Sequence, residues 1–277
     1  MAPPKAMQFG HALPHVLFQL ANSDPTYSPV CMGKYDLVDG FYRIPLTPTS
    51  SAPLAVLLPR QKGQAQLVAL PLTTTMGWTE SPPVFLGATE TVADLANARL
   101  IQYPSLPEHQ LEQVAEIPAD GYCSKDEIPV HASATHRDHT DKPVAYVDVF
   151  VDDLIGLAQG TCLRTLVSRA ILHSIDNLFH PVELLDNLKH QEPASYKNNA
   201  KDNRHMATKK SILGWDIDTR WMTIRLTNHH LAYLKELLDS IPQSRKCLPF
   251  KEWHKVLGEL RSMMMALPGV HDDGIAW

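Results

Sequence analysis

The acidic doublet Asp152-Asp153 is the part of the sequence whose chemistry is easiest to state. It interrupts an apolar, β-branched run over residues 146–157, which reads Tyr-Val-Asp-Val-Phe-Val-Asp-Asp-Leu-Ile-Gly-Leu. Because Asp is poor inside strands and good in turns, this run predicts two strands joined by a hairpin with the doublet at its tip. Two adjacent carboxylates repel each other unless a cation neutralises them, so the doublet indicates a divalent metal site. Taken alone, a polar hairpin turn without a ligand is an equally good interpretation.

A third carboxylate that could join this site is Asp36. It lies in residues 34–46, Lys-Tyr-Asp-Leu-Val-Asp-Gly-Phe-Tyr-Arg-Ile-Pro-Leu, which predict a strand that leads into a bend at Asp39-Gly40. Two strands that each bring an Asp to one end of a sheet can build a two-metal phosphoryl-transfer site, in which the ions lie about 3.5–4 Å apart. In such a site the protein contributes mostly placement and charge.

Four segments of the chain, in this order, resemble motifs of the reverse transcriptase domain of retrotransposons and retroviruses. The segment around Asp36 resembles the first palm motif, an Asp with an aromatic residue five positions later and then Pro-Leu. Residues 76–85 (Met-Gly-Trp-Thr-Glu-Ser-Pro-Pro-Val-Phe) resemble the second motif, and residues 150–153 (Phe-Val-Asp-Asp) resemble the third. Residues 212–218 (Ile-Leu-Gly-Trp-Asp-Ile-Asp) resemble the primer-grip hairpin. Each motif alone is a weak signal, whereas four in the family's order over about residues 30–226 are specific.

The resemblance implies an α+β fold: a reverse-transcriptase palm, which is an antiparallel sheet with helices on one face, together with partial fingers and the start of a helical thumb. It divides the chain into an N-terminal helix with partial fingers, a palm segment with the first two motifs, a loop or insertion, a palm segment with the Asp-Asp and primer-grip-like hairpins, and truncated thumb-like helices. The corresponding ranges are 1–29, 30–100, 101–142, 143–226 and 227–277. Because only about 35 residues precede the first motif, we expect truncated fingers and a fragment of a polyprotein or a decayed copy.

The resemblance also implies a role for each motif residue. Asp36, Asp152 and Asp153 are expected to hold two Mg²⁺ ions, which Mn²⁺ can replace, with the weakest claim for Asp153; the Leu37 carbonyl completes the shell. The other expected site residues contact the nucleotide (Phe41, Met76, Gly77) or the primer and template (Phe150, Val151, Leu213, Gly214, Trp215). The expected partners are an RNA or DNA template–primer and dNTPs, with no membrane, and protein partners are left open.

Several of these residues have a second interpretation. The ring of Phe41 is expected to exclude the 2′-hydroxyl that distinguishes RNA from DNA building blocks, but it can also be a buried core aromatic. Met76 stands where many retroviral relatives have Gln, so the hydrogen bond of that Gln is in doubt here. Plain strand pairing is as good an account of residues 213–215 as contact with a primer. Two further acids, Asp39 and Asp148, match no metal position of the family.

Composition sets limits on the class of protein. A 277-residue chain with 44% hydrophobic residues can build a sizeable core, and it contains no run of 18 apolar residues that could span a membrane. Four scattered cysteines without a CxxC pair indicate an intracellular protein, cytoplasmic or nuclear. The net charge of −5 argues mildly against a nucleic-acid partner, while lysines and arginines gathered in residues 189–225 and 245–261 favour one.

Residues 101–142 have poor periodicity and are expected to form a surface loop or a partly disordered insertion. They contain Cys123, His131, His136 and His139, from which a zinc site can be drawn. Zinc ligands usually come in close, regularly spaced pairs, so solvent exposure is the better interpretation of these residues.

Three functions follow from this sequence, in decreasing order of support. The first is an RNA-directed DNA polymerase domain that extends a DNA primer by two-metal nucleotidyl transfer. The second is a catalytically inactive, retroelement-derived remnant that keeps the fold and binds nucleic acid. The third is an unrelated α/β protein in which the acids form a structural turn.

Overall fold

A computed structural model describes residues 11–24, 26–60, 63–114, 142–179, 193–195, 206–241 and 249–264 of the chain. Its centre is a three-stranded antiparallel sheet in the order β1-β5-β4. The strands are β1 (Val30–Tyr35), β4 (Ala145–Phe150) and β5 (Asp153–Gln159). The hairpin expected around the acidic doublet is present: β4 and β5 are paired, and the last pair before the turn is Phe150 with Asp153. Strand β1 pairs along the other edge of β5.

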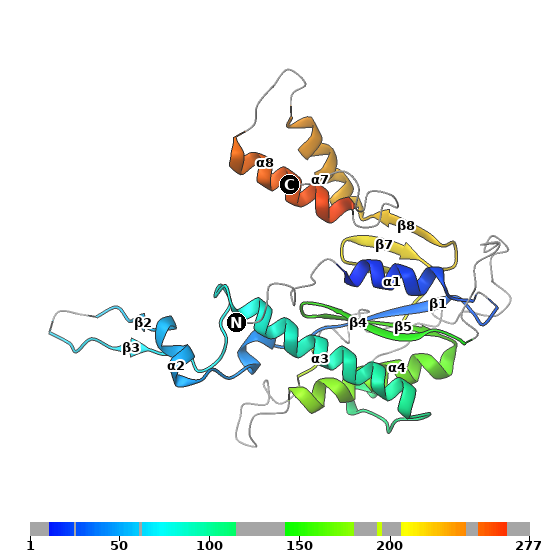
Figure 1. The fold of residues 1–277 in the computed structure, drawn as a ribbon, viewed down its shortest axis with the longest axis horizontal. Coiled ribbons are helices and arrows are strands. Elements are labelled where there is room, and N and C mark those ends of the chain that lie inside the picture. Colours follow the sequence, from blue (N-terminus) through cyan, green and yellow to red (C-terminus); the bar gives the residue numbers. More distant parts are fainter. Residues whose placement is uncertain are drawn as a thin grey trace.

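Side chains alternate between the two faces of this sheet, and each face is covered (Figure 1). On one face, α3 (Ser81–Gln102) and α4 (Thr161–Leu178) pack over Tyr35 and Leu154, both fully buried. On the other face, α1 (Ala12–Ala21) packs over Met32 and Ile155, which are also fully buried. The palm was expected to carry helices on one face, whereas here a helix and a second sheet cover the other face as well, because the strands are apolar on both sides.

The second sheet is antiparallel, with the order β6-β7-β8. Its strands are β6 (Lys209–Ile212), β7 (Trp215–Asp218) and β8 (Thr223–Leu226), and the β6–β7 turn at Leu213-Gly214 is the hairpin expected from residues 212–218. The fully enclosed side chains of Ile212 and Ile217 join the core between this sheet and α1. The hairpin therefore forms part of the fold that supports the central strands.

A third, two-stranded sheet of β2 (Val56–Leu57) and β3 (Val68–Ala69) extends away from the central sheet (Figure 1). It follows three short helices: η2 (Gly40–Arg43), α2 (Pro48–Ser51) and η3 (Ala52–Leu54). The strand expected to lead into a bend at Asp39-Gly40 ends at Tyr35, and the 3₁₀ helix η2 follows the bend. Gly40 and the bend at Asp39 explain this break, because both favour turns over strands.

The remaining elements lie at the ends of the described chain. The helix α3 begins with Pro82 and Pro83 in its first turn, where the missing N–H groups have no helical partner to lose. The short helix η4 (Gln110–Val114) follows it, and α7 (Asn228–Asp239) and α8 (Phe250–Met264) end the described part as the two expected C-terminal helices. None of the helices in the described residues is both long and apolar enough to cross a bilayer.

Candidate active site

The turn that carries the acidic doublet has a strained backbone. Val151 adopts φ +58°, a left-handed conformation that is uncommon for β-branched residues and typically costs about 1–3 kcal/mol. Helix α3 holds this conformation, because the Thr89 hydroxyl donates a hydrogen bond of 2.7 Å to the Val151 carbonyl. The half-buried Val151 side chain also packs against the core between the sheet, α3 and α4. The position of Asp152 is therefore set by tertiary contacts and not by the turn alone.

Asp36 meets the doublet at the end of the sheet. Tyr35 pairs with Leu154, so continuing the register by one residue brings Asp36 opposite Asp153. Because side chains alternate along a strand, both acids point to the face of the sheet that α1 covers. Asp36 and Asp153 therefore lie at one end and on one face of the sheet, and Asp152 directly precedes Asp153 in the hairpin turn.

A short segment from far along the chain fixes the backbone around Asp36. The Ser195 N–H donates to the Asp36 carbonyl at 2.9 Å, and the Val38 N–H donates to the Pro193 carbonyl at the same distance. Between them, Leu37 pairs with Ala194 as an isolated antiparallel bridge, and the Leu37 side chain is buried. The expected metal contact of Leu37 would thus come from its backbone carbonyl, while its side chain anchors the segment.

Burial and three charged neighbours act on the pKa of the Asp153 carboxyl. Burial raises the pKa of the Asp153 carboxyl, the hydrogen bond and charge of Lys34 lower it, and the negative charges of Asp152 and Asp36 raise it. The net result is a pKa above the usual range of an aspartate. The Lys34 Nζ lies 2.7 Å from Asp153 Oδ2, and the two side chains are 31% and 19% exposed.

Lys34 was not connected with the doublet from the sequence. A signal was present, because Lys34 precedes Asp36 by two residues on the same strand and so projects from the same face. Its partner could not be identified without the pairing of β1 with β5.

The two acids that match no metal position have other partners. Asp39 has φ +52° and directly precedes η2, as expected of a turn residue. Asp148 accepts hydrogen bonds of 3.0 Å from the Tyr146 hydroxyl and 3.0 Å from the His15 imidazole. Burial first, and then the nearby Asp148 carboxylate, raise the pKa of Tyr146, which holds the phenol in its protonated, donating form. Asp148 thus links β4 to α1.

The residues expected to contact a nucleotide lie on two adjoining segments. Phe41, in η2, is half-buried, and its ring centroid lies 4.6 Å from that of Phe85 on α3. The Thr74 hydroxyl donates to the Phe41 carbonyl, and the Thr74 N–H donates to the Ile44 carbonyl at 2.9 Å, which ties the η2 segment to the stretch before Met76. Both expected roles of Phe41 remain compatible with this position, since one ring face packs in the core and the residue keeps some exposure.

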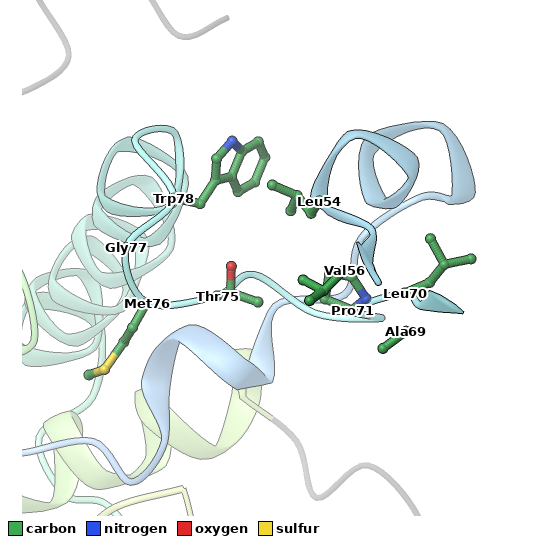
Figure 2. Close-up of a pocket in the computed structure, with 9 residues that line it drawn as sticks. All are labelled: Leu54, Val56, Ala69, Leu70, Pro71, Thr75, Met76, Gly77 and Trp78. Atoms are coloured by element: carbon green, nitrogen blue, oxygen red, sulfur yellow. The ribbon is translucent and has the colours of Figure 1, made fainter. Parts of the chain in front are cut away.

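Met76 and Gly77 form a turn at the rim of an open, mostly apolar pocket of about 570 Å³ (Figure 2). Met76 is 71% exposed, and Gly77 has φ +90°, a conformation for which glycine is the natural choice. Figure 2 shows the Trp78 side chain turned toward Leu54 across this pocket. The other lining residues come from β2, β3 and the segment after β3: Val56, Ala69, Leu70, Pro71 and Thr75.

The residues expected to contact the primer divide into a turn and a core residue. Leu213 and Gly214 have φ +49° and +83°, the left-handed pair of a tight hairpin turn. Trp215 is only 4% exposed and packs in the core below α1, so its indole supports the hairpin from inside. Phe150 is half-buried and pairs with Asp153 across the doublet turn. Strand pairing, the second interpretation of residues 213–215, is therefore present in the fold.

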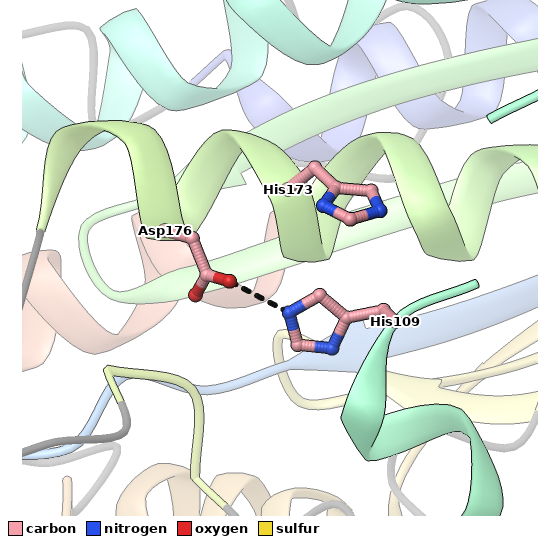
Figure 3. A group of neighbouring side chains, drawn as sticks. All are labelled: His109, His173 and Asp176. Atoms are coloured by element: carbon pink, nitrogen blue, oxygen red, sulfur yellow. Dashed lines mark hydrogen bonds and ion pairs between the residues drawn. The ribbon is translucent and has the colours of Figure 1, made fainter. Parts of the chain in front are cut away.

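A separate cluster of His109, His173 and Asp176 has the composition of a metal site (Figure 3). His109 Nε2 lies 2.7 Å from Asp176 Oδ2, and the Leu111 N–H donates to His109 Nδ1 at 3.1 Å, so the ring proton belongs on Nε2. A metal at Nε2 would have to displace that proton, and Nδ1, which faces an N–H, cannot take it up. The contacts instead clamp η4 onto α4, and Arg169 reinforces the clamp with two hydrogen bonds to the Glu112 carboxylate.

Sequence reasoning missed this clamp because its members lie up to 67 positions apart and follow no motif. The zinc site that could be drawn from Cys123, His131, His136 and His139 lies outside the described residues.

Comparisons with known proteins bear on the fold alone. No family model matches the sequence, and no curated protein matches it significantly. Among solved structures, the chain is similar to a foamy viral protease-reverse transcriptase in complex with an RNA/DNA hybrid, at 16% sequence identity and a TM-score of 0.44. The match covers 88% of this chain and 22% of that chain.

Proposed function

We propose that this chain is the nucleotidyl-transfer domain of an RNA-directed DNA polymerase, which extends a DNA primer on an RNA or DNA template. The observation that supports the proposal is the register of β1 and β5, which brings Asp36 opposite Asp153 at the end of the central sheet, next to Asp152 in the hairpin turn. The four motifs in the order of the reverse transcriptase family are the second support.

The residues present fit two magnesium ions. Mg²⁺ prefers oxygen ligands and is usually held by one or two carboxylates together with substrate phosphates and water. Asp36 and Asp152 would provide the carboxylates, with the Leu37 carbonyl as a further oxygen ligand. When bound, the two ions would lower the pKa of the primer hydroxyl and stabilise the leaving pyrophosphate oxygen. Mn²⁺ accepts the same ligands.

The chain itself contributes placement. The Thr89 hydroxyl holds the doublet turn through the Val151 carbonyl, and the bridge from Ala194 holds the backbone next to Asp36. These contacts fix the carboxylates before any substrate arrives, so little reorganisation is needed when charge develops in the transition state. Phe41, packed against Phe85, would lie below the sugar of the incoming nucleotide and exclude a 2′-hydroxyl.

Primer extension on poly(rA)/oligo(dT) with Mg²⁺ tests the proposal. Asp152→Asn is expected to lower the rate at least 100-fold, since it removes a carboxylate that holds both ions. Asp148→Asn is the matched control, because it makes the same change on the same hairpin at an acid bonded to Tyr146 and His15. Equal activity of wild type and Asp152→Asn contradicts the proposed site.

The inactive remnant that binds nucleic acid is the other outcome of this test. It is the better account if the wild type extends no primer under these conditions but still shifts a labelled RNA/DNA duplex in a salt-dependent way. Absence of both activities leaves the acids as a structural turn.

A further inference from the structure

Lys34 brings a positive charge into direct contact with the acidic doublet. It lies on β1 opposite Ile155, so Asp153, two residues before Ile155 on β5, is its diagonal neighbour on the same face of the sheet. Diagonal pairs of this kind are within reach of long side chains. The contact is made at 2.7 Å between Lys34 Nζ and Asp153 Oδ2, with both side chains at least two-thirds buried.

This contact changes the charge that the site offers to a metal. Lys34 offsets one of the three negative charges that Asp36, Asp152 and Asp153 carry together. The paired Asp153 oxygen is occupied by an ammonium group, which competes with a metal ion for the same lone pairs. Among the ion pairs of the described residues, the pair of Lys34 with Asp153 is the one that includes a carboxylate of the acidic doublet.

We infer that Lys34 is a positioning residue that keeps Asp153 as its own counter-ion and thereby restricts metal binding to Asp36 and Asp152. The inference rests on the proposed function and adds a division of labour among the three acids. It assigns Lys34 a role in setting the metal affinity. A site in which the Asp153 carboxylate were also available would hold the ions more tightly than a site with two carboxylates.

Four proteins decide the question by titration with Mn²⁺ alone, followed by electron paramagnetic resonance of the free ion. They are the wild type, Asp152→Asn, Lys34→Met and the double variant Lys34→Met/Asp153→Asn. The double variant replaces the ion pair with two uncharged side chains of similar size, so the net charge of the site does not change. Lys34→Arg, which keeps the positive charge, is the control for the single Lys34 variant.

Asp152→Asn is expected to bind Mn²⁺ at least about tenfold more weakly than the wild type, and Lys34→Met at least about fivefold more tightly, because a nearby positive charge is removed. The double variant is expected to bind within about threefold of the wild type, and Lys34→Arg likewise. The inference is overturned if the double variant binds as weakly as Asp152→Asn, because Asp153 is then a ligand in its own right. It is also overturned if Lys34→Met leaves the affinity unchanged or lowers it.

The same titration separates this inference from the proposed function. If the wild type and Asp152→Asn bind Mn²⁺ equally, no metal site exists at the doublet, and the proposed function fails together with the inference. If Asp152→Asn alone behaves as expected, the proposed site stands and only the role of Lys34 is rejected. Should the double variant not fold, the direction of the change in Lys34→Met decides.

Discussion

Gly40 has no room for a side chain, although its backbone conformation does not require glycine. An ideal Cβ at this position would lie 2.5 Å from Cζ and 2.8 Å from Cε2 of Phe85. The Phe85 ring is fully buried between Phe41, at a centroid distance of 4.6 Å, and Phe179, at 6.2 Å. Because neighbouring rings block its retreat on both sides, Gly40→Ala must displace either Phe85 or the η2 turn that carries Phe41.

The size of the effect can be worked out from two terms. Overpacking a well-filled core typically destabilises by about 1–3 kcal/mol. Replacing glycine also reduces the freedom of the unfolded chain, which offsets about 0.4–1 kcal/mol. We therefore expect Gly40→Ala to lower the free energy of unfolding by about 1–2 kcal/mol, which corresponds to a fall in Tm of about 2–8 °C for a chain of this size.

Gly87→Ala is the matched control on the partner helix. Gly87 lies inside α3, is exposed, and has no atom within 4 Å of an ideal Cβ. The same chemical change is therefore expected to stabilise the protein by about 0.5–1 kcal/mol, the usual gain from Gly to Ala in a helix. Opposite signs for the two variants would show that contact with Phe85, and not the change in chain entropy, decides the outcome.

Urea unfolding of the single variants and of Gly40→Ala/Phe85→Leu measures both the effect and its cause. Phe85→Leu alone should destabilise by leaving a cavity, but it also makes room for the alanine, so the double variant should lose less than the sum of the two. A Gly40→Ala variant as stable as the wild type would refute the reasoning. So would additive losses in the double variant, because the ring would then not be the obstacle.

Three further variants test other parts of the structure. Burial first, and then the charges of Asp94 and Asp148, raise the pKa of Glu90 above 4.5, so ionised Glu90 destabilises the folded state. Glu90→Gln should therefore raise the Tm at pH 7. Thermal melts should show that this advantage vanishes below about pH 4.5, where the carboxyl is protonated in both the folded and the unfolded state. Arg169→Gln removes two hydrogen bonds to Glu112 and should lower the free energy of unfolding by about 1–3 kcal/mol in urea. Amide hydrogen exchange in η4 should become faster. Unchanged exchange would show that these contacts are unnecessary for holding η4 on α4. Phe41→Val should admit ribonucleotides in primer extension, and unchanged discrimination would reject the ring as a steric gate.

Local patterns predicted much of the fold. The apolar run broken by Asp152-Asp153 folds as the expected hairpin. The amphipathic residues 161–178 form α4 (Thr161–Leu178), and Pro82 and Pro83 lie in the first turn of α3. These elements depend on residue spacing and turn preferences, which act over a few positions and can be read from neighbouring residues.

Other expectations were limited by contacts that no local pattern contains. The bend expected at Asp39-Gly40 is present, but the 3₁₀ helix η2 that follows it, packed against Phe85 of α3, could not be read from the bend. Trp215, for which primer contact and strand pairing were both expected interpretations, is 4% exposed and belongs to the core cluster that includes residues of α1. The sequence of α1 does not indicate which face of which sheet this helix covers.

The sequence by itself determined which residues could form a metal site: an acid followed by a bend, and an acidic doublet at the tip of a hairpin. Only the tertiary structure decided that β1 pairs with β5 in the register that brings Asp36 beside Asp153. The same register places Lys34 within 2.7 Å of that carboxylate. Register is set by the burial of both faces of the sheet across more than a hundred residues of intervening chain, and a slip of one residue would turn these side chains to the opposite face.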